Sequence, residues 1–109
     1  MLKIKGTIPV AITIAGSDSG GGAGIQADLK TFAALGVHGT TAITSVTAQN
    51  TCSVSAVEDL KPEMVRAQIK AVAEDLGIDA GKTGMLHTEK IIKAVSSEVS
   101  KYNFPFVVD

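Results

Sequence analysis

A glycine-rich segment near the amino terminus is the part of the sequence best suited to bind a ligand. Residues 16–24 contain five of the eleven glycines of the 109-residue chain. The segment follows a short apolar run and precedes a helical pattern, so its backbone can approach a ligand closely. Such a loop also points the first amide groups of the helix toward the ligand.

Three kinds of binding loop compete for this segment. A Walker-type phosphate loop needs Lys and Ser or Thr after its last glycine, but residues 25–26 are Ile-Gln. The spacing of Gly22, Gly24 and Ala27 matches a dinucleotide-binding loop. That kind of loop also needs a ribose-binding acid about 20 residues later, and residues 30–56 hold no Asp or Glu. The third kind is a loop that encloses a small polar substrate.

Asp28 is the candidate ligand-facing acid of this third kind of loop. It stands three residues after Ile25, in the first turn of the expected helix. The helix dipole favours a carboxylate there, and the carboxylate can accept a hydrogen bond from a hydroxyl or an amine. The same position suits a first-turn acid that binds no ligand, and both interpretations fit the spacing.

Two further polar loops follow predicted strands. Gln49 and Asn50 come directly after an apolar, β-branched run. A Gln side chain offers a donor and an acceptor side by side, which complements an aminopyrimidine edge. Both amides could instead satisfy the backbone of a turn. In the next loop, Gly84 permits close backbone approach, and Met85 can pack its thioether on a ring or fill the edge of the core.

The remaining reactive side chains do not suggest a metal or redox site. His38 and His87 have no Cys, Asp or His partner at metal-ligand spacing, so we expect both to lie at loop ends or on the surface. Cys52 has no second cysteine with which to form a disulfide, which fits a reducing compartment. We therefore predict no metal-ligating residues and a structural or incidental role for Cys52.

Composition and charge point away from several classes of protein. The net charge of −1, without a basic run, gives no electrostatic reason to bind nucleic acid or an anionic membrane. No apolar stretch approaches the roughly 18–20 residues that cross a bilayer. Residues 1–6 lack the apolar region of a signal peptide. We expect a single cytoplasmic domain over residues 1–109.

Predicted strands alternate with predicted helices along the chain. The strands are residues 10–15, 40–48, 54–57, 78–83 and 104–109, and the helices are residues 25–35, 62–76 and 88–99. The inward-facing side chains of the three helices are Ile25, Leu29, Phe32 and Ala33; Val65, Ile69, Val72 and Leu76; and Ile91, Ile92, Val95 and Val99. This alternation predicts an α/β fold with a mainly parallel sheet, helices on both faces and residues 106–108 as a central strand. Ligands of such sheets bind at the carboxyl ends of strands, so the three polar loops should converge.

The three loops together carry a family resemblance. They read Ala-Gly-Ser-Asp-Ser-Gly-Gly-Gly-Ala-Gly-Ile-Gln-Ala-Asp-Leu, then Thr-Ala-Gln-Asn-Thr, then Lys-Thr-Gly-Met-Leu. Over residues 8–109 the chain resembles the hydroxymethylpyrimidine (phosphate) kinases of thiamine biosynthesis, in the ribokinase-like superfamily. The resemblance implies the amino-terminal part of a three-layer sandwich. It also implies transfer of the ATP γ-phosphate, with Mg²⁺, to hydroxymethylpyrimidine and then to its monophosphate.

The resemblance also implies roles for individual residues. Gln49 matches the glutamine that pairs with the pyrimidine, and Met85 matches a methionine that packs near the ring. Other positions of the same pocket are matched by Gly16, Asp28 and Thr47. Asp109 matches the start of an Asp-Pro segment close to the nucleotide phosphates and Mg²⁺.

The sequence also departs from the family pattern. Ser19 and Gly20 stand where the family often has Pro and Ser, which predicts a looser empty loop. Thr83 stands where Ile is frequent, which predicts a slightly altered pocket wall.

We expect the chain to be the substrate-binding portion of a longer kinase. The catalytic base is expected beyond Asp109, so the chain alone is expected to be inactive. A pyridoxal-type vitamin kinase and a non-catalytic pyrimidine-binding module are the alternatives. The expected partners are a small-molecule pyrimidine and a second copy in a homodimer, with no nucleic acid and no membrane.

Overall fold

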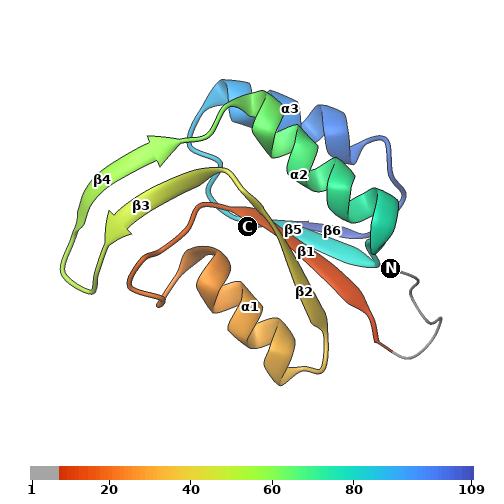
Figure 1. Ribbon diagram of the computed structural model, residues 1–109, viewed down its shortest axis with the longest axis horizontal. Coiled ribbons are helices and arrows are strands. Elements are labelled where there is room, and N and C mark those ends of the chain that lie inside the picture. The colour runs from red at the N-terminus through yellow and green to blue at the C-terminus, as the bar shows by residue number, and fades with distance from the viewer. Residues whose placement is uncertain (1–7) are drawn as a thin grey trace.

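The structure, a computed structural model, describes residues 8–109 and has an α/β architecture (Figure 1). In chain order the elements are β1 (Val10–Ala15), α1 (Gly24–Ala34), β2 (His38–Ile43), β3 (Ser45–Gln49), β4 (Val54–Asp59), α2 (Pro62–Asp75), β5 (Ala80–Thr83), α3 (Glu89–Val99) and β6 (Phe106–Val108). The predicted alternation of strands and helices is confirmed. The expectation about a signal peptide concerns residues 1–6, which lie outside the described residues.

A parallel four-stranded sheet forms the centre of the fold. Its strand order is β2-β1-β5-β6, and all three neighbouring pairs are parallel. All six side chains of β1 are buried, which explains why residues 10–15 are apolar without alternation. The helix α1 covers one face of this sheet, and α2 and α3 cover the other (Figure 1). The predicted mainly parallel sheet with helices on both faces is therefore confirmed.

The core lies between the sheet and the helices α2 and α3. Its largest fully buried apolar side chains are Ile12, Ile14, Ile69, Ile91 and Val65. On the other face, Gly39 allows α1 to pack closely on β2. A Cβ at that position would lie 2.7 Å from Leu29 Cδ2 and 3.0 Å from Phe32 Cδ2.

Most of the predicted helix faces point inward, with two exceptions. Ala33 is exposed, on the side of α1 that faces away from β1 and β2, the strands on which this helix packs. Ile92 is also 50% exposed, whereas Glu98 occupies a buried position on α3. Its carboxylate accepts hydrogen bonds from Tyr102 Oη at 2.9 Å and Lys101 Nζ at 3.1 Å. These partners allow a charged side chain to be buried on the inward face of α3, whereas Ile92 lies outside that face.

The predicted strand over residues 40–48 is wrong, because the structure contains two strands there. β2 ends at Ile43, opposite Ala15, the last residue of β1. Beyond that point β1 offers no further partner, and β3 pairs instead with β4 in a separate antiparallel sheet. Figure 1 shows this β3–β4 hairpin projecting from the main sheet. The break is important because it turns one face of β3 toward the glycine-rich loop.

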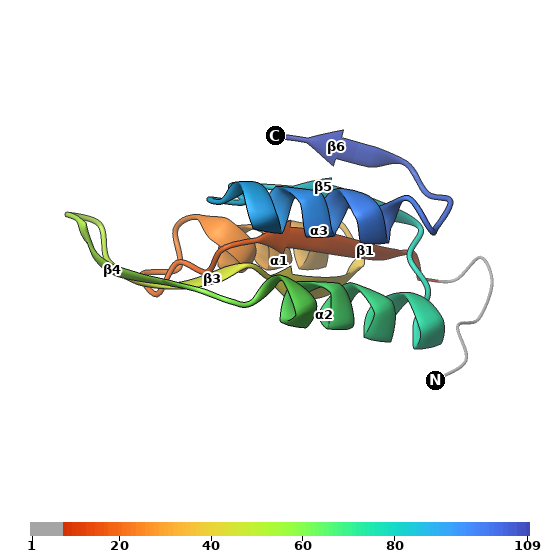
Figure 2. The same cartoon turned by 90° about the horizontal axis from the view of Figure 1, so that it is seen from above.

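The position predicted for residues 106–108 is also wrong for the described chain. The strand β6 lies at the edge of the four-stranded sheet rather than at its centre (Figure 2). Val107 and Val108 are 65% and 81% exposed. In residues 8–109, no helix is long and apolar enough to span a membrane.

Two buried threonines in this fold make a matched test of hydrogen bonding. Thr13 Oγ1 donates to Asp28 Oδ2 at 2.6 Å, whereas Thr44 Oγ1 is buried without a partner among the described residues. Thr13→Val should lower the free energy of unfolding by about 1.5–3 kcal/mol, because it removes a hydrogen bond to a charged group. Thr44→Val should raise it by about 1 kcal/mol, because a buried unpaired hydroxyl is costly. Urea unfolding of both variants measures the difference, and an equal loss in both would contradict this account.

Candidate functional site

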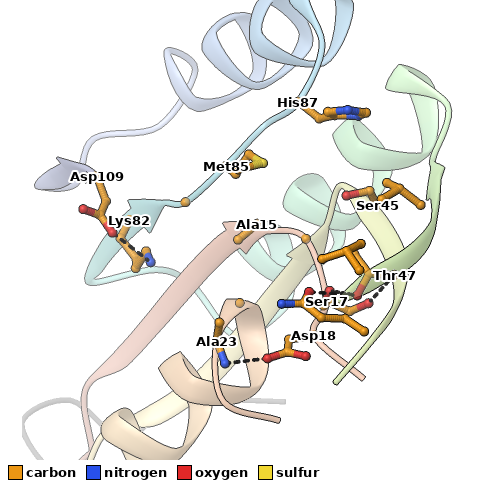
Figure 3. Close-up of a pocket in the computed structure, with 16 residues that line it drawn as sticks. Ala15, Ser17, Asp18, Ala23, Ser45, Thr47, Lys82, Met85, His87 and Asp109 are labelled. Carbon is orange, nitrogen blue, oxygen red and sulfur yellow. Dashed lines mark hydrogen bonds and ion pairs between the residues drawn. The ribbon is translucent and has the colours of Figure 1, made fainter. Parts of the chain in front are cut away.

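A pocket forms where the loops after β1 and β5 meet the strand β3 (Figure 3). Its volume is about 390 Å³, which suits a ligand built on one ring. The pocket is lined by Ala15, Gly16, Ser17, Asp18, Ala23, Gly24, Ser45, Thr47, Gln49, Val54, Val57, Lys82, Gly84, Met85, His87 and Asp109. The predicted convergence is confirmed for the glycine-rich loop, Gln49, Gly84 and Met85. Gln49 is the last residue of β3, however, and Asn50 and Thr51 of the predicted second loop do not line the pocket.

Asp18 holds the glycine-rich loop in shape. The residue is only 5% exposed, and its carboxylate accepts three backbone N–H bonds. Gly20 N donates to Oδ1 at 2.8 Å, and Gly22 N and Ala23 N donate to Oδ2 at 3.0 and 2.8 Å. A carboxylate that accepts several N–H groups organises a loop which would otherwise be mobile because of its glycines.

Two glycines of the loop are required by close approach. Gly24 has φ +59°, and a Cβ there would lie 2.5 Å from Gly16 O. Gly16 lies against β3, because a Cβ on it would be 2.8 Å from Ser45 Oγ. The helix α1 begins in this contact, since Ile25 N donates to Gly16 O at 3.1 Å. Any larger residue at position 24 would push the loop away from the start of the helix.

The strand β3 forms the second wall and is bonded to the loop. Ser17 N donates to Ser45 O at 2.9 Å, and Thr47 Oγ1 donates to Ser17 O at 2.7 Å. Gln49 N donates to Ser19 Oγ at 2.6 Å, and the same hydroxyl donates to Gln49 O. These hydrogen bonds restrain the loop, although Gly20 in place of the family's Ser predicts a more flexible one.

The two amides of the second loop have different roles. Asn50 Oδ1 accepts from Cys52 N at 2.8 Å and from Ser53 N at 3.1 Å, so this side chain stabilises the hairpin turn. Gln49 lines the pocket, and its Oε1 lies 3.3 Å from Thr47 Oγ1. Because the one hydroxyl proton of Thr47 is donated to Ser17 O, the Gln49 carboxamide keeps its hydrogen-bonding capacity for a ligand.

The third wall comes from the loop after β5. Gly84 packs against β1, where a Cβ would lie 2.9 Å from Ala15 Cβ. Met85 is 77% exposed at the pocket, so it does not fill the core. His87 has φ 71°, and its Nδ1 lies 2.7 Å from Asp59 Oδ1. This contact joins the loop to β4. His87 therefore lines the pocket, which the sequence did not predict.

One end of the pocket is charged. Lys82 Nζ lies 3.0 Å from Asp28 Oδ2 and 3.9 Å from Asp109 Oδ2. Asp28 does not line the pocket itself and reaches it through Lys82, whereas Asp109 does line it. Sequence analysis missed Lys82. Lys82 stands between two buried residues of β5. A lysine within a strand of the core is rarely found without a charged partner, and this could have indicated it.

The remaining candidates lie away from this arrangement. Thr83 is buried and does not line the pocket, so its departure from the family pattern does not reach the pocket wall. Cys52 is exposed in the hairpin turn. In the described part of the chain, no group of three or more His, Cys, Asp or Glu side chains could hold a metal ion.

Comparison with known proteins gives consistent matches. A family model described as phosphomethylpyrimidine kinase matches residues 18–109. The hydroxymethylpyrimidine/phosphomethylpyrimidine kinase of Bacillus subtilis is 58% identical over 98 residues, covering 90% of this chain and 36% of that protein. The one from Rhizobium meliloti is 54% identical over 100 residues, covering 92% and 38%. The chain thus spans less than two fifths of the length of these relatives.

Solved structures show the same similarity. The crystal structure of phosphomethylpyrimidine kinase from Clostridium difficile has a TM-score of 0.90 and 52% identity, covering 93% of this chain and 44% of that one. The Staphylococcus aureus pyridoxal kinase in complex with AMP-PCP and pyridoxal has a TM-score of 0.84 and 40% identity, covering 95% and 39%. These are ribokinase-like kinases, and the predicted fold class is confirmed.

The role of Asp18 can be tested by removing its charge. Asp18→Asn replaces one of the two acceptor oxygens by an NH₂ group, which then faces backbone N–H groups that have lost their acceptor. The free energy of unfolding should therefore fall by about 1–3 kcal/mol. Amide hydrogen exchange should accelerate at Gly20, Gly22 and Ala23. Glu58→Gln, the same change on an exposed strand, is the matched control. Unchanged exchange at these three amides would show that Asp18 does not organise the loop.

Proposed function

Because the chain belongs to the phosphomethylpyrimidine kinase family, we propose that it supplies the pyrimidine pocket of an ATP-dependent kinase of thiamine biosynthesis. In this proposal the enzyme phosphorylates hydroxymethylpyrimidine and then its monophosphate. The observation that carries the proposal is the single pocket that brings Gln49 and Met85 together beside the glycine-rich loop. Residues 1–109 act as one domain, in the cytoplasm and as a homodimer.

The neutral side of the pocket suits a flat, amine-bearing ring. Gln49 can present its donor and its acceptor to two neighbouring polar atoms of an aminopyrimidine. Met85 can lay its polarizable sulfur on the ring, and its exposure leaves it free to do so. The valines Val54 and Val57 of β4 add apolar surface on the hairpin side. We therefore assign ring binding to Gln49 and Met85, with Gly16 and Thr47 shaping the pocket.

Asp28 takes a different place in this proposal. Its carboxylate is already bonded to Thr13 and Lys82, so it supports the charged end of the pocket instead of contacting the ring directly. The two carboxylates around Lys82 leave this end with a net negative charge. A phosphate group would therefore bind there together with a cation.

Asp109 fits one ligand position of a Mg²⁺–nucleotide complex. Proteins commonly hold Mg²⁺ through one or two carboxylates, with substrate phosphates completing the octahedron. Asp109 is exposed at the pocket, and Lys82 lies close enough to orient it. When bound, Mg²⁺ neutralises charge on the phosphates of ATP. ATP is the proposed phosphoryl donor, because the relatives are kinases and one solved relative contains AMP-PCP.

The general base of the reaction is not assigned to the described residues. Two carboxylates line the pocket, Asp18 and Asp109. Asp18 accepts three backbone hydrogen bonds, and Asp109 faces Lys82. Asp18 is held by the loop backbone, and Asp109 is assigned to the Mg²⁺ position, so we propose that the base comes from outside residues 8–109. The chain by itself then acts as the binding portion of the enzyme.

The proposed function predicts a ligand preference that calorimetry can measure. Hydroxymethylpyrimidine should bind more tightly than pyridoxal, because Gln49 matches the aminopyrimidine edge. Gln49→Leu should weaken hydroxymethylpyrimidine binding about tenfold or more, because two hydrogen bonds of about 1 kcal/mol each are lost. Asn50→Ala, which removes the neighbouring amide, should change affinity little and only loosen the turn.

The outcome separates the two related kinase functions. The pyridoxal alternative has support from the solved pyridoxal kinase that is 40% identical. Tighter binding of pyridoxal than of hydroxymethylpyrimidine, with little effect of Gln49→Leu, would favour that alternative and contradict the proposal.

A further inference from the structure

Ser45 is a buried pocket residue whose hydroxyl has no partner in the described part of the chain. The side chain is 5% exposed and lines the pocket. Within residues 8–109 no hydrogen bond involves its Oγ. The neighbouring loop serines differ, because Ser17 Oγ accepts from Thr47 N at 3.2 Å and Ser19 Oγ bonds Gln49. Polar side chains of buried residues normally have a partner, so a pocket-facing hydroxyl without one among the described residues is available to a ligand group.

The Ser45 hydroxyl also remains accessible from the pocket. Thr44 Oγ1, one residue earlier, is the side-chain oxygen that is sealed in the interior without a partner in the described chain. Ser45 Oγ instead lies beside Gly16, where an added Cβ would be only 2.8 Å away. The glycine thus keeps open the space next to this hydroxyl.

The strand β3 aligns Ser45 with the ring-binding amide. Side chains alternate along a strand, so Ser45, Thr47 and Gln49 face the pocket while Val46 is 51% exposed on the other face. Figure 3 shows Ser45 and Thr47 on the same side of the pocket, opposite Lys82 and Asp109. The Gln49 carboxamide bends back to 3.3 Å from Thr47 Oγ1. Thr47 follows Ser45 by about 7 Å along the strand, a separation that one substituted six-membered ring can span.

We propose that the Ser45 hydroxyl binds the ligand directly, at a second polar position on the same ring that pairs with Gln49. A hydroxyl donates and accepts, so it fits either a ring nitrogen or an amine. The proposal rests on the proposed function for the choice of a pyrimidine. It makes Ser45 a specificity-determining residue and explains why glycine is needed at position 16.

The first test is calorimetric titration of the purified protein with hydroxymethylpyrimidine and, separately, with pyridoxal. Ser45→Ala should weaken binding of the preferred ring roughly five- to tenfold, the range expected for one hydrogen bond. Its melting temperature should not fall, because no described residue bonds the hydroxyl. A residue with a merely structural role would show the reverse pattern. Ser96→Ala, on the exposed side of α3, is the matched control and should leave affinity unchanged.

A double-mutant cycle makes the test more specific. Gly16→Ala alone should weaken binding. The new Cβ would lie 2.8 Å from Ser45 Oγ, so it must displace this oxygen. In the Ser45→Ala background that oxygen is gone, and the nearest remaining atom of residue 45 is its carbonyl oxygen at 3.6 Å. Gly16→Ala should therefore cost much less affinity in that background. Independent effects of the two substitutions would overturn the proposed link.

The two ligands distinguish failure of this inference from failure of the proposed function. If the wild type binds hydroxymethylpyrimidine and Ser45→Ala binds it equally well, the Ser45 inference is overturned and the function stands. If the wild type prefers pyridoxal and Ser45→Ala weakens that binding, the Ser45 inference holds and the pyrimidine assignment fails. If neither ring binds the wild type, both are overturned.

Discussion

The contact between the glycine-rich loop and the start of β3 is the constraint on which the pocket depends. Thr47 donates two hydrogen bonds to Ser17 across this contact, through its N–H and its hydroxyl, and Ser17 N donates to Ser45 O. The approach is so close that a Cβ on Gly16 would lie 2.8 Å from Ser45 Oγ. The break after Ile43 serves the same contact, because it frees β3 from the main sheet. Without this contact, the β3–β4 hairpin would not be held against the glycine-rich loop. Gln49 would then not face the other residues of the pocket.

The pocket separates two kinds of chemistry between its ends. Neutral donors and acceptors of β3 face one end, whereas Lys82 and Asp109 line the other, with Asp28 bonded to Lys82 from outside the pocket. A substrate with a neutral heterocycle and a group that becomes phosphorylated needs this division. The ring is then recognised without a charge that would compete with the phosphates. Phosphoryl transfer depends mainly on positioning and on charge stabilisation, so holding the ring rigidly is a large part of the task.

Much of the fold follows from local sequence patterns, and less of the site does. The strand at residues 10–15, the helix stops at Gly36 and Gly77 and the cap by Thr88 are all local features, and the structure confirms them. The break at Thr44 was missed because residues on both sides of it are equally β-branched. That break depends on where β1 ends, which is information from a different part of the chain. Gln49 and Met85 were found from the family resemblance.

The residues that sequence analysis overlooked act through partners distant in the chain. Asp18 looks like one more polar loop residue until its three backbone donors are seen. Lys82 and Asp28 are 54 positions apart and meet because α1 packs on β1, the strand that pairs with β5. The Ser45 side chain gains its meaning because its hydroxyl has no partner among the described residues, which no sequence pattern can reveal.

The most direct test of the account is an amide chemical-shift map of the protein during titration with hydroxymethylpyrimidine. The account predicts that the largest shifts fall in three separate segments, residues 16–24, 45–49 and 82–87, and that they saturate together. Residues of α2 and α3 that face away from the pocket should change little. Shifts concentrated on those helices, or confined to one of the three segments, would contradict the claim that these loops form one binding site.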